Sequence, residues 1–128
     1  MMIVIDRSLA EPVYAQIARQ IRESVAAGEL PTGTPLPTVR VLASDLGVNL
    51  NTVARAYWLL EEEGFVHIRD RSGAEVAAPA RKPAEERTRL CQELKKVLAR
   101  LYQAGLSTEE LKHVAEREIA SLGGSSEK

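Results

Sequence analysis

A pair of short helix-forming segments joined at a glycine constrains the fold more than any other feature of the sequence. The first segment begins after Thr38, whose hydroxyl can cap a helix, and it reaches Gly47, a natural left-handed terminator. The second begins after Asn49, a further capping residue, and it reaches Gly64. Each segment carries apolar residues at helical spacing on one face. Two helices joined by so tight a turn predict a helix-turn-helix.

The flanking segments extend this pair into a winged helix. Residues 12–28 begin with a proline, end with a glycine and repeat an apolar residue at every fourth position, which predicts a first helix. Residues 31–37, P-T-G-T-P-L-P, are rich in proline, so we expect a stiff loop rather than a helix or a central strand. Residues 65–69 and 74–77 read as two strands joined by a turn at 70–73. The predicted fold is mainly α with a small β-hairpin.

Residues 80–128 predict a short two-helix segment. A linker with prolines at both ends precedes a long amphipathic helix to about Ala104, and Ser107 with Glu110 forms a capping box for the next helix. About 50 residues are too few for an independent core, so the apolar stripes should meet the winged helix or a second copy. We favour a symmetric homodimer. The predicted interface residues are Leu90, Leu94, Val97, Leu98, Leu101, Leu111, Val114 and Ile119.

Composition sets aside several classes of protein. With 45% hydrophobic and 27% charged residues, the chain is expected to be soluble and globular, and no apolar run approaches the ~18 residues of a membrane helix. The opening M-M-I-V-I-D-R does not read as a signal peptide and Cys91 is single, so we expect a cytoplasmic protein. His67 and His113 are too isolated for a metal site, and no catalytic set is recognisable. We expect neither an enzyme nor a cofactor.

The charge balance gives a nucleic-acid function no support. Residues 1–78 hold seven Arg or Lys against ten Asp or Glu, a net charge of −3. A DNA-binding protein of this composition would have to gather its cations on one face. The run Glu61–Glu63 is expected to form a solvated face at the far end of its helix, which would keep negative charge away from DNA.

Three stretches together resemble the GntR family of bacterial transcriptional regulators. They read P-V-Y-A-Q-I-A-R-Q-I-R, G-E-L-P-T-G-T-P-L-P-T-V-R-V-L-A and L-G-V-N-L-N-T-V-A-R-A-Y-W-L-L-E-E-E-G-F-V, within about residues 11–78. The C-terminal part, with its G-L-S-T-E-E-L step, is similar to the YtrA-like subfamily. The resemblance implies a DNA-binding domain at 11–79, a dimerisation or regulatory segment at 80–128, and a homodimeric repressor of a palindromic operator in double-stranded DNA, often for a transporter operon.

Matching positions in the family, together with the two arginines Arg69 and Arg71 of the wing, imply a set of DNA-binding residues. They are Thr38, Arg40, Asn49, Asn51, Thr52, Arg55, Arg69, Arg71 and Gly73. Asparagine can bond an adenine edge bidentately, threonine can meet a phosphate or a thymine methyl group, and the N–H groups of a first helical turn attract phosphate. The alternative for the asparagines is plain helix capping, and Arg40 could instead pair with Asp45.

Several positions depart from the family pattern. Leu50 and Ala54 stand where many relatives have arginine, so we expect an operator that is recognised more through A/T contacts and DNA shape. In the wing, Asp70 replaces a frequent Arg, Arg71 a Gly and Glu75 an aromatic residue, which leaves Arg69 and Arg71 for phosphate contact. We expect the single tryptophan to pack against the wing or the N-terminal segment.

Two further hypotheses remain open from the sequence. The alternative function is a winged-helix adapter that binds protein through residues 84–122 without sequence-specific DNA binding. A small-molecule effector is also left open, with no ligand identified, and its pocket would lie between helices or between subunits.

Overall fold

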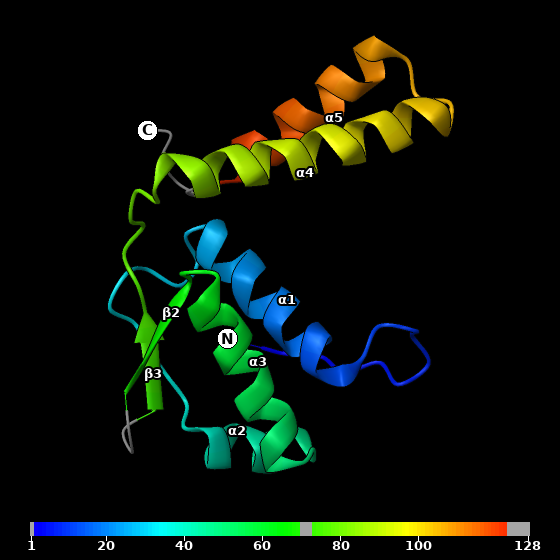
Figure 1. Cartoon of the computed structure of the whole chain (residues 1–128). Coiled ribbons are helices and arrows are strands. Elements are labelled where there is room, and N and C mark those ends of the chain that lie inside the picture. Colours follow the sequence, from blue (N-terminus) through cyan, green and yellow to red (C-terminus); the bar gives the residue numbers. More distant parts are fainter. Residues whose placement is uncertain (1, 70–72, 123–128) are drawn as a thin grey trace. The chain divides into compact units, whose positions relative to one another are not determined.

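The computed structural model describes residues 2–69 and 73–122 and divides into two compact units, one ending at Pro79 and the other spanning Ala80–Leu122. The elements of the first unit are α1 Val13–Ala26, β1 Pro35–Leu36, α2 Val39–Leu46, α3 Leu50–Glu62, β2 Val66–Arg69 and β3 Gly73–Val76 (Figure 1). The second unit holds α4 Ala84–Gln103 and α5 Thr108–Ser121. Three helices followed by a hairpin confirm the predicted winged helix.

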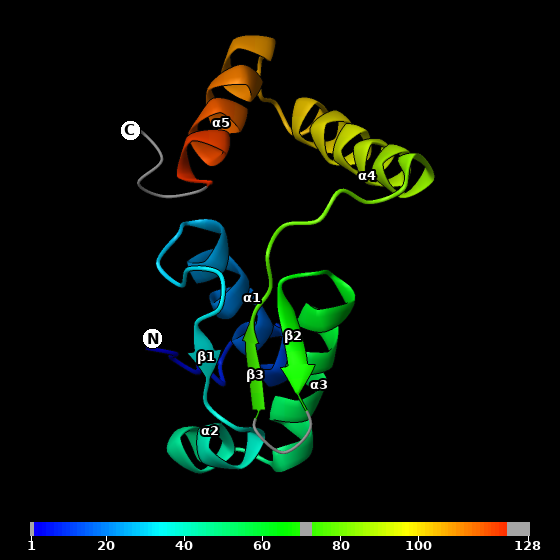
Figure 2. The ribbon, with the colours of Figure 1, turned by 90° about the vertical axis from the view of Figure 1, so that its left-hand side faces the viewer.

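The core of the first unit lies between its helices and one face of its sheet. α1 packs along α3, α2 packs across the beginning of α3, and the strands close the remaining side (Figure 2). The apolar faces predicted from helical spacing point into this core. Its buried members are Ile17, Ala18, Ile21, Leu36, Leu42, Ala43, Val53, Ala56, Tyr57, Leu60, Val66, Ala74 and Val76.

Helix caps set the angle between α2 and α3. The hydroxyl of Thr38 accepts a hydrogen bond from the N–H of Val41 at 3.1 Å, and the side chain of Asn49 accepts one from the N–H of Asn51 at 2.7 Å. Gly47 adopts a φ of 68° between the two helices, which an L side chain rarely adopts. The caps and the turn predicted from the sequence are confirmed.

The proline-rich segment differs from the expected stiff loop. Pro35 and Leu36 form β1, which pairs antiparallel with Glu75 and Ala74 of β3, so the sheet has the order β1-β3-β2. Proline is tolerated there because β1 is an edge strand and the missing N–H does not interrupt a ladder on both sides. Pro35 and Leu36 form a strand because they pair with the distant β3, and the sequence around the two residues does not encode this pairing.

The acids at the end of α3 do more than form a solvated face. Glu61, Glu62 and Glu63 are exposed, but a carboxylate oxygen of Glu61 accepts a hydrogen bond from the N–H of Ile68 at 2.9 Å. Glu63 forms an ion pair with Arg22 of α1, also at 2.9 Å. These contacts fasten the end of α3 to the hairpin and to α1.

The second unit is a helical hairpin without a buried residue. Ser107 and Glu110 make the predicted capping box at the start of α5, with hydrogen bonds of 3.1 and 2.8 Å. Between Ala80 and Leu122 no side chain is buried, and Leu94 and Ile119 remain 57% and 65% exposed. Among the residues described, no helix is both long and apolar enough to cross a membrane.

Candidate nucleic-acid interface

A groove lies where α2 and α3 begin and where the hairpin strands approach their turn. It has a volume of about 510 Å³. Figure 2 shows the N-terminal end of α3, α2 and the Arg69–Gly73 end of the strands at the same end of the unit. The groove brings four of the predicted DNA-binding residues together. Its lining residues are Thr38, Val39, Arg40, Leu50, Asn51, Ala54, Tyr57, Trp58, Ile68 and Gly73.

Arg40 supplies the positive charge of this groove. Its side chain is exposed in the first turn of α2, and it forms no ion pair with any residue that the structure describes, Asp45 included. No acidic residue belongs to the described lining of the groove. An unpaired guanidinium beside the N-terminus of a helix makes an electropositive surface suited to phosphate.

The first turn of α3 separates this groove from a second, smaller hollow. Asn51 lines both hollows, is exposed and makes no side-chain hydrogen bond within the described chain. Thr52 and Arg55 line the second hollow, of about 240 Å³, together with Val13 and Tyr14 of α1. Asn49 lines neither hollow, and its side-chain amide oxygen Oδ1 accepts a hydrogen bond from the N–H of Asn51 to cap α3.

Arg55 is held by an aromatic ring. Its guanidinium carbon lies 3.9 Å from the centroid of the Tyr14 ring, a cation–π contact between α3 and α1. The contact leaves the N–H groups at the edge of the guanidinium plane free to donate, and Arg55 forms no ion pair within the described residues. The sequence predicted an exposed Arg55 but gave no sign of Tyr14, which lies 41 positions away on another helix.

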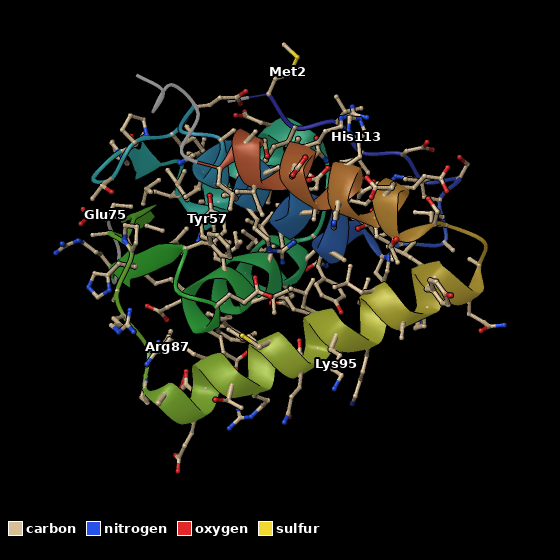
Figure 3. The ribbon with its side chains drawn as sticks, turned by 90° about the horizontal axis from the view of Figure 1, so that it is seen from above. Met2, Tyr57, Glu75, Arg87, Lys95 and His113 are labelled. Atoms are coloured by element: carbon tan, nitrogen blue, oxygen red, sulfur yellow. The ribbon has the colours of Figure 1, made fainter. Side chains whose placement is uncertain are left out.

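The two charged residues described in the hairpin strands neutralise each other. Arg69 of β2 forms an ion pair with Glu75 of β3 at 2.8 Å, and both side chains are partly exposed. The hydrogen bond raises the pKa of Arg69 and lowers the pKa of Glu75, so both groups stay charged at neutral pH. Figure 3 shows Glu75 at the outer side of the sheet, in contrast to the enclosed Tyr57. Arg71 and Asp70 lie outside the described residues.

Gly73 is buried and has a positional role. Its φ is 92°, and a Cβ atom there would come within 3.3 Å of the Thr38 Cα and 3.4 Å of the Leu36 carbonyl oxygen. A side chain at this position would push the start of β3 away from the α2 cap. Gly73 therefore shapes the groove by allowing the backbone of β3 to lie close to the backbone of residues 36–38.

Trp58 contradicts the packing expected from the sequence. Its side chain is 67% exposed and lines the groove rather than covering the wing or the N-terminal segment. The reason is geometric: Ala56, Tyr57 and Leu60 occupy the buried arc of α3, and Trp58 falls one step outside it.

Tyr57 is a positioning residue that sequence reasoning placed in the core without a polar role. Its hydroxyl donates a hydrogen bond of 2.7 Å to the carbonyl of Pro37, immediately before the α2 cap. Burial raises the pKa of Tyr57, so the hydroxyl remains a neutral donor. Within the described residues, no group of three or more His, Cys, Asp or Glu side chains is placed to hold a metal ion. The groove offers contacts for binding.

Comparison with known proteins places this geometry in a family. The model of the gntR family of bacterial regulatory proteins matches residues 13–76. A helix-turn-helix transcriptional regulator of Mycobacterium tuberculosis is 49% identical over 69 residues, which cover 54% of this chain and 57% of that protein. The transcriptional repressor YtrA of Bacillus subtilis is 34% identical over 112 residues, which cover 86% of each chain.

A solved structure extends the likeness beyond the winged helix. YtrA from Sulfolobus acidocaldarius, described as a GntR-family transcription factor, has 39% sequence identity and a TM-score of 0.62. The likeness covers 77% of this chain and 99% of that structure. These proteins are regulators of transcription rather than enzymes. The chain belongs to the gntR family of bacterial regulatory proteins.

Proposed function

We propose that the chain is a homodimeric repressor that binds a palindromic operator in double-stranded DNA. The first unit supplies the DNA-binding surface and the second supplies the dimer contact. α3 of each subunit enters the major groove, with half-sites about one helical turn (~34 Å) apart or at another separation set by the dimer. The single observation that carries the proposal is the groove beside α3: among the residues that the structure describes, its lining holds no acid, its Arg40 forms no ion pair and its Asn51 makes no side-chain hydrogen bond.

The location of the charges explains how a unit of net charge −3 can bind DNA. Arg40 lies beside the first turn of α3 in a groove without a described acid, whereas Glu61 and Glu62 line a separate hollow further along the helix, together with Arg55. The helix dipole at the start of α3 adds positive potential next to Asn51. The net charge is therefore a poor guide to the local field at the binding surface.

The second unit supports the homodimer. Its helices leave a row of leucine, valine and isoleucine side chains exposed, as would be expected of a surface that a second copy covers. A repressor role and a transporter operon as its target follow from the likeness to the YtrA-like regulators. Winged-helix adapter function is less well supported, because a protein-binding surface gives no reason for an arginine that has no ion pair among the described residues and lies beside two helix N-termini.

The test begins with selection of bound DNA from a random pool, followed by affinity measurements across a range of salt concentrations. We expect log Kd to rise steeply with log salt, because phosphate contacts release counterions. Arg40→Ala should weaken binding to every sequence and lower the salt slope by about one. Lys96→Ala removes the same charge from exposed α4 and should change neither quantity. Affinity that is indifferent to salt would favour the adapter.

A further inference from the structure

The exposed face of α3 carries an apolar stripe inside the groove. Leu50, Ala54 and Trp58 follow one another at intervals of four residues, so they lie on one side of the helix. All three line the groove, where Leu50 is 42% and Trp58 67% exposed. None of them is needed for the core, since α3 fills it with Val53, Ala56, Tyr57 and Leu60.

The surroundings of the stripe specify the chemistry of its partner. Arg40 is the one charged residue among the described lining, and the amide of Asn51 stands next to Leu50 without a side-chain hydrogen bond in the described chain. A partner that suits both parts has negative charge at its edge and small apolar groups at its centre. Duplex DNA has this pattern in the major groove, where phosphates border the C5-methyl groups of thymine.

We infer that the Leu50–Ala54–Trp58 stripe recognises thymine through its 5-methyl group and packs Trp58 against the carbon face of the adjoining nucleotide. Leu50 and Ala54 contact the methyl groups, Arg40 holds a phosphate at the rim, and Asn51 bonds a neighbouring base edge. This inference rests on the proposed function, and it assigns the specificity of the operator to apolar contacts. Recognition then requires few arginines on α3, which agrees with Arg55 being the single arginine of this helix.

The test removes the methyl groups from the DNA instead of altering the protein alone. Each thymine of the selected operator is replaced in turn by deoxyuridine, which preserves base pairing. Covering one methyl-sized group changes an equilibrium constant by about fourfold, so the Kd should rise about fourfold at one or two positions in each half-site. With Leu50→Ala, this loss at those positions should shrink or vanish, whereas Trp58→Ala should weaken binding to the thymine and deoxyuridine operators alike.

Matched variants separate the stripe from a general loss of apolar surface. Val4→Ala removes a side chain that is 64% exposed and lies outside the groove, and it should keep the full deoxyuridine effect. Trp58→Phe should retain most of the affinity, since a flat apolar ring remains. All substituted side chains are at least partly exposed, and thermal unfolding of each variant confirms that it is folded.

Trp58 also reports directly on its own contact. It is the single tryptophan of the chain, so its fluorescence should shift and lose intensity when operator DNA covers the ring. Emission that changes with protein concentration in the absence of DNA would place a second copy in the groove and overturn the inference. Emission that responds to a small molecule but not to operator would do the same.

The outcomes distinguish the inference from the proposed function. If no DNA sequence is selected, the proposed function fails and the inference falls with it. If an operator binds with a steep salt dependence but deoxyuridine has no effect at any position, the proposed function stands and the assignment of thymine recognition to the stripe is wrong. A methyl effect that persists unchanged in Leu50→Ala would assign the thymine contact to another part of the protein.

Discussion

Arg69 carries a positive charge that the hairpin already neutralises, because its guanidinium lies 2.8 Å from the carboxylate of Glu75. Contact with a DNA phosphate would have to compete with this ion pair. Glu75→Gln removes the competing charge, so we expect tighter binding to every DNA sequence and a salt slope that is steeper by about one. Titration with operator DNA at several salt concentrations measures both quantities.

The control for this prediction is Glu29→Gln, which makes the same change of charge at an exposed acid outside the sheet. An equal gain in both variants would show that net charge, rather than release of Arg69, is responsible. The experiment belongs at neutral pH. The pKa of Glu75 is lowered, so the pair is present above the ordinary carboxyl pKa and is lost only as the pH falls through the lowered folded value.

At the scale of elements, α3 positions α2 through one hydrogen bond as well as through packing. The Tyr57 hydroxyl donates to the Pro37 carbonyl, one residue before the cap of α2. Tyr57→Phe keeps the buried ring and removes only the donor, at a cost of about 1 kcal/mol. For a unit of this size we expect the Tm to fall by roughly 4–8 °C. Tyr102→Phe changes a ring that is 60% exposed on α4 and should leave the Tm unaltered. Equal Tm values for all three proteins would mean that the bond contributes nothing.

Elements whose signals are local could be predicted from the sequence. Thr38, Asn49 and Ser107 each cap the helix that begins beside them, and Gly47 ends α2, because the hydrogen bonds involved span two to five residues. The apolar faces of α1 and α3 were equally readable, since helical spacing fixes which residues point inward. The winged-helix order follows from these local signals in sequence.

Contacts between distant segments could not be predicted in the same way. β1 exists because β3 pairs with it, and Arg55 is held because Tyr14 of another helix lies under it. Nothing within a few residues of Pro35 or Arg55 encodes either partner. Trp58 shows a second limit, since an aromatic residue beside a core stripe suggests burial until the packing of α3 shows that its place is outside.

At the scale of the whole molecule, the two units differ in how they could be stable. The first has its own core, whereas α4 and α5 bury no side chain between Ala80 and Leu122. A helical hairpin with so little buried area gains too little from the hydrophobic effect to offset the entropy of ordering its residues. A second copy would supply the missing contact, and it would also bring two DNA-binding units onto one operator.

The homodimer proposal predicts that a substitution in α4 can disrupt the dimer and weaken binding to the full operator without changing the DNA-binding unit. Leu94→Glu places a charge at an exposed position of α4, so the isolated subunit should lose little stability. In the dimer the same charge would be buried between two apolar helices, which is costly. We expect light scattering to give the mass of one chain. Affinity for the full palindrome should fall by roughly 10²–10⁴, because binding by one unit no longer raises the local concentration of the other.

Half-site DNA and a neighbouring substitution complete the test. Affinity for a single half-site should stay unchanged in Leu94→Glu, since the groove beside α3 belongs to the first unit. Lys96→Glu introduces the same acidic side chain two positions along the helix, on the side turned away from Leu94, and should leave the dimer intact. If the Leu94→Glu protein remains a dimer, the contact between the subunits lies in the winged helix and not in α4 and α5. In that case the exposed faces of α4 and α5 would be free for a different partner, which the adapter hypothesis requires.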